Sequence, residues 1–120
     1  MAPSGKPLPR VMTDANVLVA GNAFPRWPYE VLRHALRGDY RLFLCPYILT
    51  EARRTMARAF PDHAYRLEHF FKVCPYQEVK DPSKRTVKKN LQLVRSAKDV
   101  PVVLAAKRAR IQYLVTNDKD

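Results

Sequence analysis

The chain has 120 residues, of which 47% are hydrophobic, and it carries a formal net charge of +11 at pH 7. This length suits a single domain with a core of its own, and the hydrophobic fraction excludes an intrinsically disordered chain. The excess of 22 Lys and Arg over 11 Asp and Glu favours a polyanionic partner, a nucleic acid before an anionic membrane surface.

The cysteines and the length of the apolar runs bear on the cell compartment. Cys45 and Cys74 form neither a Cys-x-x-Cys pair nor a disulfide framework, so we expect a reduced, intracellular protein in which both are core residues. No apolar run reaches the ~20 residues of a membrane span, and Asp14 interrupts the apolar N-terminal segment, unlike in a signal peptide. These features predict a cytoplasmic protein without a membrane partner.

An apolar run opens the predicted domain. Residues 1–9 hold three prolines and are expected to be a flexible N-terminal segment, so that residues 10–120 form the single domain. Residues 11–20 are almost all apolar and rich in β-branched side chains, which predicts a buried strand. Asp14 lies within this run, where an unpaired carboxylate costs several kcal/mol. It must therefore either face a cation at the end of the strand or cap the next turn.

Helices and strands alternate along the rest of the chain. Apolar periodicity and the positions of Gly and Pro predict helices over residues 29–36, 46–59, 62–71, 85–94 and 101–108, and strands over residues 41–45, 73–79 and 111–116. Strands separated by helices pair in parallel through right-handed crossovers. We therefore predict an α/β fold, a three-layer α/β/α sandwich with a central parallel sheet.

Four acidic residues fall where such a fold places its functional crevice, beyond the carboxyl ends of the strands. Asp14 and Asp118 lie at or just after the ends of two strands, and Glu51 and Asp99 are expected to open helices at the same edge. Converging carboxylates repel one another unless a cation neutralises them, and the hard ions Mg²⁺ and Mn²⁺ prefer oxygen ligands. The sequence therefore predicts a site for one or two of these ions.

Each acid also has a structural alternative. Glu51 can pair with Arg54 on a solvated helix face, and Asp99 can cap the helix that follows it. Asp118 and Asp120 are common turn residues. Only the joint placement of these acids at the ends of strands favours the metal site.

Basic residues near these acids are candidates to bind phosphate groups. They are Arg53, Arg54 and Arg58 beside Glu51, Lys98 beside Asp99, and the cluster of Lys84, Arg85, Lys88 and Lys89. For each of them the alternative is a solvated basic surface. A steep dependence of RNA binding on salt would support the set.

The order and spacing of these residues resemble the PIN-domain family. The resemblance rests on the segment Val11-Met12-Thr13-Asp14-Ala15-Asn16-Val17-Leu18, on Glu51, on Asp99 before the alanine-rich residues 102–106, and on residues 113–116 followed by Asn117-Asp118-Lys119-Asp120. Members of this family open with an Asp-x-Asn motif after a hydrophobic strand and have a Thr-x-Asp motif after a later one. The resemblance covers nearly the whole chain.

This resemblance implies a PIN-like fold and a metal-dependent endoribonuclease similar to the VapC-like toxins of bacterial toxin-antitoxin pairs. By that resemblance, Mg²⁺ or Mn²⁺ is held at the catalytic site by Asp14, Glu51, Asp99 and Asp118. Supporting roles fall to Asn16, Thr116 and Asp120. The family continues with another strand and further helix beyond this point, so we expect a chain shortened at its C-terminus.

The resemblance also implies partners. RNA is the expected substrate, and an antitoxin protein is the expected inhibitor. A homodimer is a further expectation, because Tyr65, Phe70 and Phe71 are predicted to form an exposed apolar helix face.

Two other functions fit parts of the pattern. Ala15 stands where the family often has Thr or Ser, and Ser96 stands where many members add an acid, which favours a non-catalytic PIN-like module that binds RNA or protein. An Asp after the first strand also suits an aspartate-nucleophile phosphatase. That chemistry needs an acid two residues later, where this chain has Asn16.

Overall fold

A parallel sheet of four strands lies at the centre of the structure, a computed structural model that describes residues 7–93 and 99–117. The strands are β1 (Arg10–Thr13), β2 (Arg41–Leu44), β3 (Gln77–Glu78) and β4 (Tyr113–Val115). They are ordered β3-β2-β1-β4, and every neighbouring pair is parallel. Because β1 is flanked by β2 and β4, segments from the two ends of the chain meet beside it.

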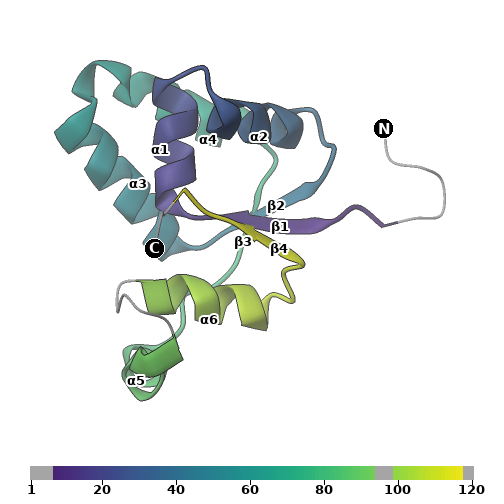
Figure 1. The fold of residues 1–120 in the computed structure, drawn as a ribbon, viewed down its shortest axis with the longest axis vertical. Helices are drawn as coiled ribbons and strands as arrows, with labels where there is room; N and C mark the ends of the chain where they lie inside the picture. Colours follow the sequence, from purple (N-terminus) through teal and green to yellow (C-terminus); the bar gives the residue numbers. More distant parts are fainter. Residues whose placement is uncertain (1–6, 94–98, 118–120) are drawn as a thin grey trace.

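Helices cover both faces of this sheet (Figure 1). On one side lie α1 (Ala15–Ala23), α2 (Trp27–Leu36), α3 (Pro46–Ala59) and α4 (Ala64–Val73), and on the other lie α6 (Val100–Arg108) and α5 (Lys84–Lys89). Two short 3₁₀ turns, η1 (Pro61–His63) and η2 (Leu91–Leu93), follow α3 and α5. The prediction of a three-layer α/β/α sandwich with a parallel sheet is confirmed.

The prediction of one strand over residues 11–20 is wrong. The strand β1 ends at Thr13, and α1 begins at Ala15. Most of α1 is buried, including Val17, Leu18 and Val19, because α2, α3 and α4 all pack against it. A helix buried on several sides has no polar face, so periodicity cannot separate it from a buried strand.

The other predicted helix and strand boundaries differ less from those of the structure. The predicted strand 73–79 is reduced to Gln77–Glu78, because α4 continues through Val73. The helix predicted from Asp62 begins at Ala64 after the 3₁₀ turn, and Asp62 is not its N-cap. The basic helix predicted over residues 85–94 ends at Lys89 and is followed by η2, and residue 94 lies outside the described residues.

The core contains both cysteines, as predicted from the sequence. Cys45 and Cys74 are free thiols and both are buried. Burial raises the pKa of the Cys45 thiol to about 12 and that of Cys74 to about 11. Both side chains are therefore neutral, apolar core residues at physiological pH.

The exposed apolar face and the absence of a membrane-spanning helix were both predicted from the sequence. Phe70 is buried, so its assignment to an exposed apolar face is wrong, whereas Tyr65 of that face is 65% exposed. The aromatic ring of Phe70 belongs to the core because α4 turns that side toward α1 and α3. Among the helices of residues 7–93 and 99–117, none has the length and apolar character needed to cross a membrane.

Gly21 allows α1 and α2 to approach closely. A Cβ atom at this position would overlap the Leu32 side chain and lie 2.9 Å from the Pro28 carbonyl oxygen. The contact with Pro28 involves backbone, which cannot move aside as a side chain can. The α1–α2 packing therefore depends on the absence of a side chain at residue 21.

We predict that Gly21→Ala lowers the free energy of unfolding by about 1–3 kcal/mol, because overpacking displaces α2. Urea denaturation measures the loss. As a control, Ala57→Met enlarges an exposed position of α3 and should change the free energy of unfolding by less than ~0.5 kcal/mol. Equal stability of Gly21→Ala and the unmodified chain would contradict the close packing described here.

Candidate functional site

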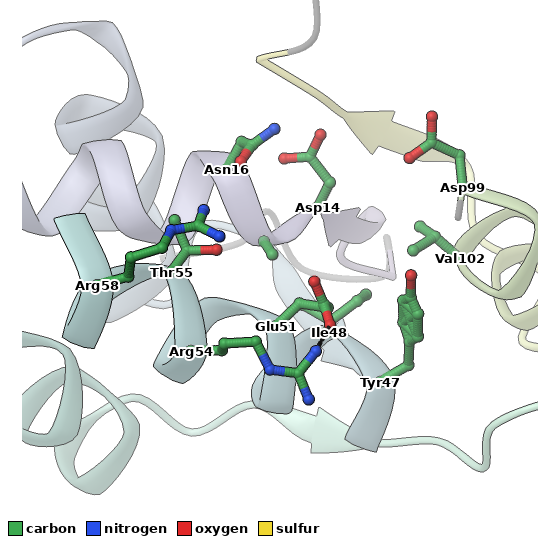
Figure 2. Close-up of a pocket in the computed structure, with 11 residues that line it drawn as sticks. Asp14, Asn16, Tyr47, Ile48, Glu51, Arg54, Thr55, Arg58, Asp99 and Val102 are labelled. Atoms are coloured by element: carbon green, nitrogen blue, oxygen red, sulfur yellow. Dashed lines mark hydrogen bonds and ion pairs between the residues drawn. The ribbon is translucent and has the colours of Figure 1, made fainter. Parts of the chain in front are cut away.

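Three carboxylates surround one hollow at the edge of the sheet where β1 and β2 end. This acid pocket has a volume of about 230 Å³. Its lining consists of Asp14, Ala15, Asn16, Tyr47, Ile48, Glu51, Arg54, Thr55, Arg58, Asp99 and Val102. Figure 2 shows Asp14, Glu51 and Asp99 around this pocket, with the Glu51 carboxylate joined to Arg54. Three of the four predicted metal-binding acids thus share one pocket.

Asp14 is fixed by hydrogen bonds of its backbone and its side chain. Its backbone N–H donates to the Val115 carbonyl oxygen at 3.1 Å, which joins the end of β1 to the end of β4. Its Oδ1 accepts from the Val17 N–H at 2.9 Å, so Asp14 is the N-cap of α1. The capping alternative and the placement in the pocket are therefore both realised.

Glu51 reaches the pocket from the second turn of α3, so the expectation that it opens the helix is wrong. Pro46 is the first helical residue instead. The Glu51 carboxylate accepts a hydrogen bond from Arg54 Nη1 at 2.7 Å, which is the pairing expected as its structural alternative. The two side chains are 33% and 66% exposed, so this ion pair contributes little to stability.

Asp99 occupies the N-cap position of α6 without acting as a side-chain cap. Its backbone is in the right-handed helical region, and its side chain makes no capping hydrogen bond. An N-cap residue that bonds its own helix normally has extended backbone, as Asp14 does. The predicted capping role of Asp99 is therefore wrong, and its carboxylate lines the acid pocket.

Tyr47 lies between the acids, and sequence reasoning did not single it out. Burial raises the pKa of the Tyr47 phenol, and the negative charges of Glu51 and Asp99 raise it further, while Arg54 opposes them. The ring therefore lies within the electrostatic field of two acids on different helices. The spacing between Tyr47 and Glu51 could have indicated this residue. The two are four positions apart on a helix, so they share one face.

Asp81 positions the first turn of α3 from a distant loop. Cys45 occupies the N-cap position but provides no side-chain hydrogen bond. Instead Asp81 Oδ1 accepts from the Tyr47 N–H at 2.9 Å. This bond joins residues 34 positions apart, and no local pattern in the sequence indicates it.

The predicted phosphate-binding residues separate into distinct places. Arg54 and Arg58 line the acid pocket. Arg53 instead reaches α4, where its guanidinium donates to both carboxylate oxygens of Glu68 at 2.9 and 3.1 Å and lies 4.9 Å from the Phe71 ring centroid. The cluster Lys84, Arg85, Lys88 and Lys89 lines a separate hollow on α5.

The remaining predicted residues lie at the C-terminal end of the domain or beyond the described part. Thr116 follows β4 and is exposed, and Asn16 lines the acid pocket. Asp118, Asp120 and Lys98 lie outside the described residues.

The donor set of the acid pocket suits a hard cation. Its acidic and amide side chains offer oxygen ligands, and neither Cys nor His lines it, which favours Mg²⁺ or Mn²⁺ over zinc. A volume of about 230 Å³ is far above the ~15 Å³ that a single water needs, so the pocket has room for a hydrated ion. Within residues 7–93 and 99–117, however, no three Asp, Glu, His or Cys side chains lie close enough to ligate one ion as they stand.

Comparison with known proteins identifies the fold family. The sequence model described as the PIN domain matches residues 10–120. The chain belongs to the PIN domain family. The resemblance noted in the sequence is therefore confirmed, and the acid pocket lies within the matched region.

Solved structures share this PIN fold at low sequence identity. PAE2754 from Pyrobaculum aerophilum is 16% identical with a TM-score of 0.65, over 92% of this chain and 81% of that one. VapBC2 from Rickettsia felis, bound to a DNA fragment from its promoter, is 15% identical with a TM-score of 0.57, over 90% of this chain and 98% of that one. No curated protein sequence matches the chain significantly.

We predict that Asp81→Ala lowers the free energy of unfolding by about 1 kcal/mol, because the first turn of α3 loses its capping acceptor. Urea denaturation measures this loss. Asp81→Asn is the matched control, since its amide oxygen can still accept from Tyr47, and it should retain most of the stability. Equal losses in the two variants would mean that the charge of Asp81, and not the cap, is responsible.

Proposed function

We propose that this PIN domain is a metal-dependent endoribonuclease that hydrolyses phosphodiester bonds of RNA. The observation that carries the proposal is the meeting of Asp14, Glu51 and Asp99 around one pocket that also contains two arginines. PIN domains are generally nucleases. The net charge of +11 favours a polyanionic substrate, although the pocket itself is rich in acids.

The acids are the proposed ligands for Mg²⁺ or Mn²⁺. Asp14, Glu51 and Asp99 would hold the ion, together with Asp118, which follows the Thr116-Asn117 dipeptide beyond β4 in the sequence. When bound, such an ion lowers the pKa of a water and neutralises charge on the attacked phosphate. Asp14 Oδ1 already accepts from Val17, so its other oxygen is the available one for this purpose.

The basic residues of the pocket would position the RNA. Arg54 and Arg58 lie one turn apart on α3, and residues at this spacing lie on the same helix face. Guanidinium groups bind phosphate oxygens through two hydrogen bonds, which orients a phosphodiester as well as attracting it. We assign a secondary role to Lys98 from its place beside Asp99 in the sequence, and supporting roles to Asn16, Thr116 and Asp120. Arg53 has a structural role on α4 in this proposal.

Ion binding in this proposal requires a local rearrangement of Glu51. Its carboxylate is held by Arg54 at 2.7 Å, and a guanidinium and a divalent cation compete for the same oxygens. Substrate phosphate offers Arg54 a replacement partner. The pairing would then change from Glu51–Arg54 to Glu51–metal and Arg54–phosphate as the complex forms.

An antitoxin is the proposed protein partner, and the cytoplasm is the proposed compartment. VapBC2 from Rickettsia felis, whose fold this chain shares, was solved bound to a DNA fragment from its promoter. The support for an antitoxin is this similarity together with family membership.

A non-catalytic PIN-like module that binds RNA or protein is the second candidate. The observation in its favour is that the described acids do not form a ready-made ion site while Glu51 is paired with Arg54. Such a module would bind RNA without Mn²⁺ and leave it intact. Binding and cleavage must therefore be measured separately.

We predict that Asp14→Asn reduces Mn²⁺-dependent RNA cleavage by at least ~100-fold, because a proposed ligand and its charge are lost. The fold should be retained, because Asn caps a helix about as well as Asp. Cleavage of a labelled RNA gives the rate, and urea denaturation gives the stability. Equal cleavage by both proteins would mean that another nuclease contaminates the preparation, and RNA binding without cleavage would favour the second candidate.

A further prediction concerns the Glu51–Arg54 pair. Arg54→Gln should bind Mn²⁺ a few-fold more tightly, since an exposed ion pair of about 0–1 kcal/mol no longer competes for Glu51. The same variant should bind RNA more weakly. Calorimetry without RNA measures the first effect, and fluorescence anisotropy of labelled RNA measures the second.

Arg53→Gln is the matched control, because Arg53 is the neighbouring arginine on α3 but pairs with Glu68. It should leave both affinities unchanged. Unchanged Mn²⁺ affinity in Arg54→Gln would contradict the proposed competition between Arg54 and the ion for Glu51.

A further inference from the structure

A second hollow lies next to the acid pocket, further along α1. This aromatic hollow has a volume of about 310 Å³ and is lined by Ala20, Phe24, Arg26, Trp27, Pro28 and Asn117. Asn16 lines the acid pocket and Ala20 lines the aromatic hollow. Residues four apart share one helix face and have Cβ atoms ~6 Å apart. The two hollows therefore follow one another along α1 at a separation of one helical turn.

Two aromatic rings of this hollow are exposed to solvent. Trp27 is 50% exposed and Phe24 is 43% exposed. The Phe24 ring packs edge-on against Phe60, with centroids 5.2 Å apart at an interplanar angle of 90°. Trp27 is the first residue of α2 and precedes Pro28, whose ring restricts the backbone there. Both rings therefore offer flat apolar surfaces to solvent, and the Phe24 ring is also supported from one side by Phe60.

Cationic and amide groups border these rings. The Arg26 guanidinium lies 5.9 Å from the Phe24 ring centroid, and within the described residues it forms no ion pair with a carboxylate. Among residues 7–93 and 99–117, no acid lines the hollow, in contrast to the acid pocket. Exposed aromatic rings beside an arginine are the groups on which unpaired bases of single-stranded nucleic acids stack.

We propose that the aromatic hollow binds an unpaired nucleobase of the RNA strand whose phosphodiester enters the acid pocket. The base stacks on Trp27, and Arg26 contacts the adjoining phosphate. This inference rests on the proposed function, since the acid pocket is what places the strand. It makes single-stranded RNA the substrate class, because a base paired within a duplex cannot stack on a protein ring.

Trp27 reports directly on this contact, because it is the only tryptophan of the chain. Single-stranded oligoadenylate, added in the presence of a chelator to prevent cleavage, should quench its fluorescence in a saturable way. Inorganic polyphosphate, which carries charge without bases, should bind but leave the fluorescence unchanged. Duplex RNA should quench it less than the single strand does at equal occupancy.

Variants test the same contact by anisotropy of labelled oligoadenylate. Trp27→Ala should weaken binding on the order of tenfold, the usual effect of removing one stacking ring. Trp27→Tyr should restore most of the affinity, because it keeps an aromatic face. Tyr65→Ala is the matched control, since Tyr65 is an exposed aromatic residue on α4 outside both hollows, and it should bind normally.

Two results would overturn the inference: bound oligoadenylate that leaves Trp27 fluorescence unchanged, or equal weakening in Trp27→Ala and Trp27→Tyr. Mn²⁺-dependent cleavage, measured separately, distinguishes this failure from that of the proposed function. Cleavage without quenching would rule out base binding in the aromatic hollow but not the nuclease function. Quenching without cleavage would rule out the nuclease function and indicate a module that binds single-stranded RNA.

Discussion

The parallel pairing of β1 with the strands on either side of it is the constraint on which the site depends. Val11 and Met12 pair with β2 on one side, and Val11 to Thr13 pair with β4 on the other. The Asp14 N–H continues the second ladder by donating to Val115. Because all strands run in the same direction, the segments that follow them leave from the same edge. Side chains far apart in the sequence thus meet there without any loop of special shape.

The acid pocket brings negative charges close together within a protein whose net charge is positive. Three carboxylates lie around one hollow: Asp14 caps a helix N-terminus, Glu51 pairs with Arg54, and Asp99 lines the hollow from the start of α6. Burial raises the pKa of Tyr47, and the nearby charges of Glu51 and Asp99 raise it further. Repulsion of this kind costs stability unless a counter-charge is bound, and proteins tolerate it where binding a cation is useful.

Sequence reasoning succeeded where a single local pattern determined the outcome. Pro46 and Pro61 bracket α3, and its ends are those predicted. Alternation of helices and strands led to the parallel sheet. Sequence reasoning failed where contacts with neighbouring helices determine the secondary structure. Residues 15–20 are helical because three helices cover them, and an apolar run carries no information about which neighbours it will have. Asp81 was missed because its role depends on a contact between residues 34 positions apart.

The bond between Asp14 and Val115 also has a consequence for when the site can exist during synthesis. It joins residues that are almost a whole domain apart in the sequence, and such non-local contacts form late because the intervening chain must first be ordered. On the ribosome, β1 emerges early and lacks its β4 neighbour until β4 itself has been translated and released. The side of the pocket that carries Asp99, and the bond from Asp14 to Val115, can therefore form only after α6 and β4 have left the exit tunnel.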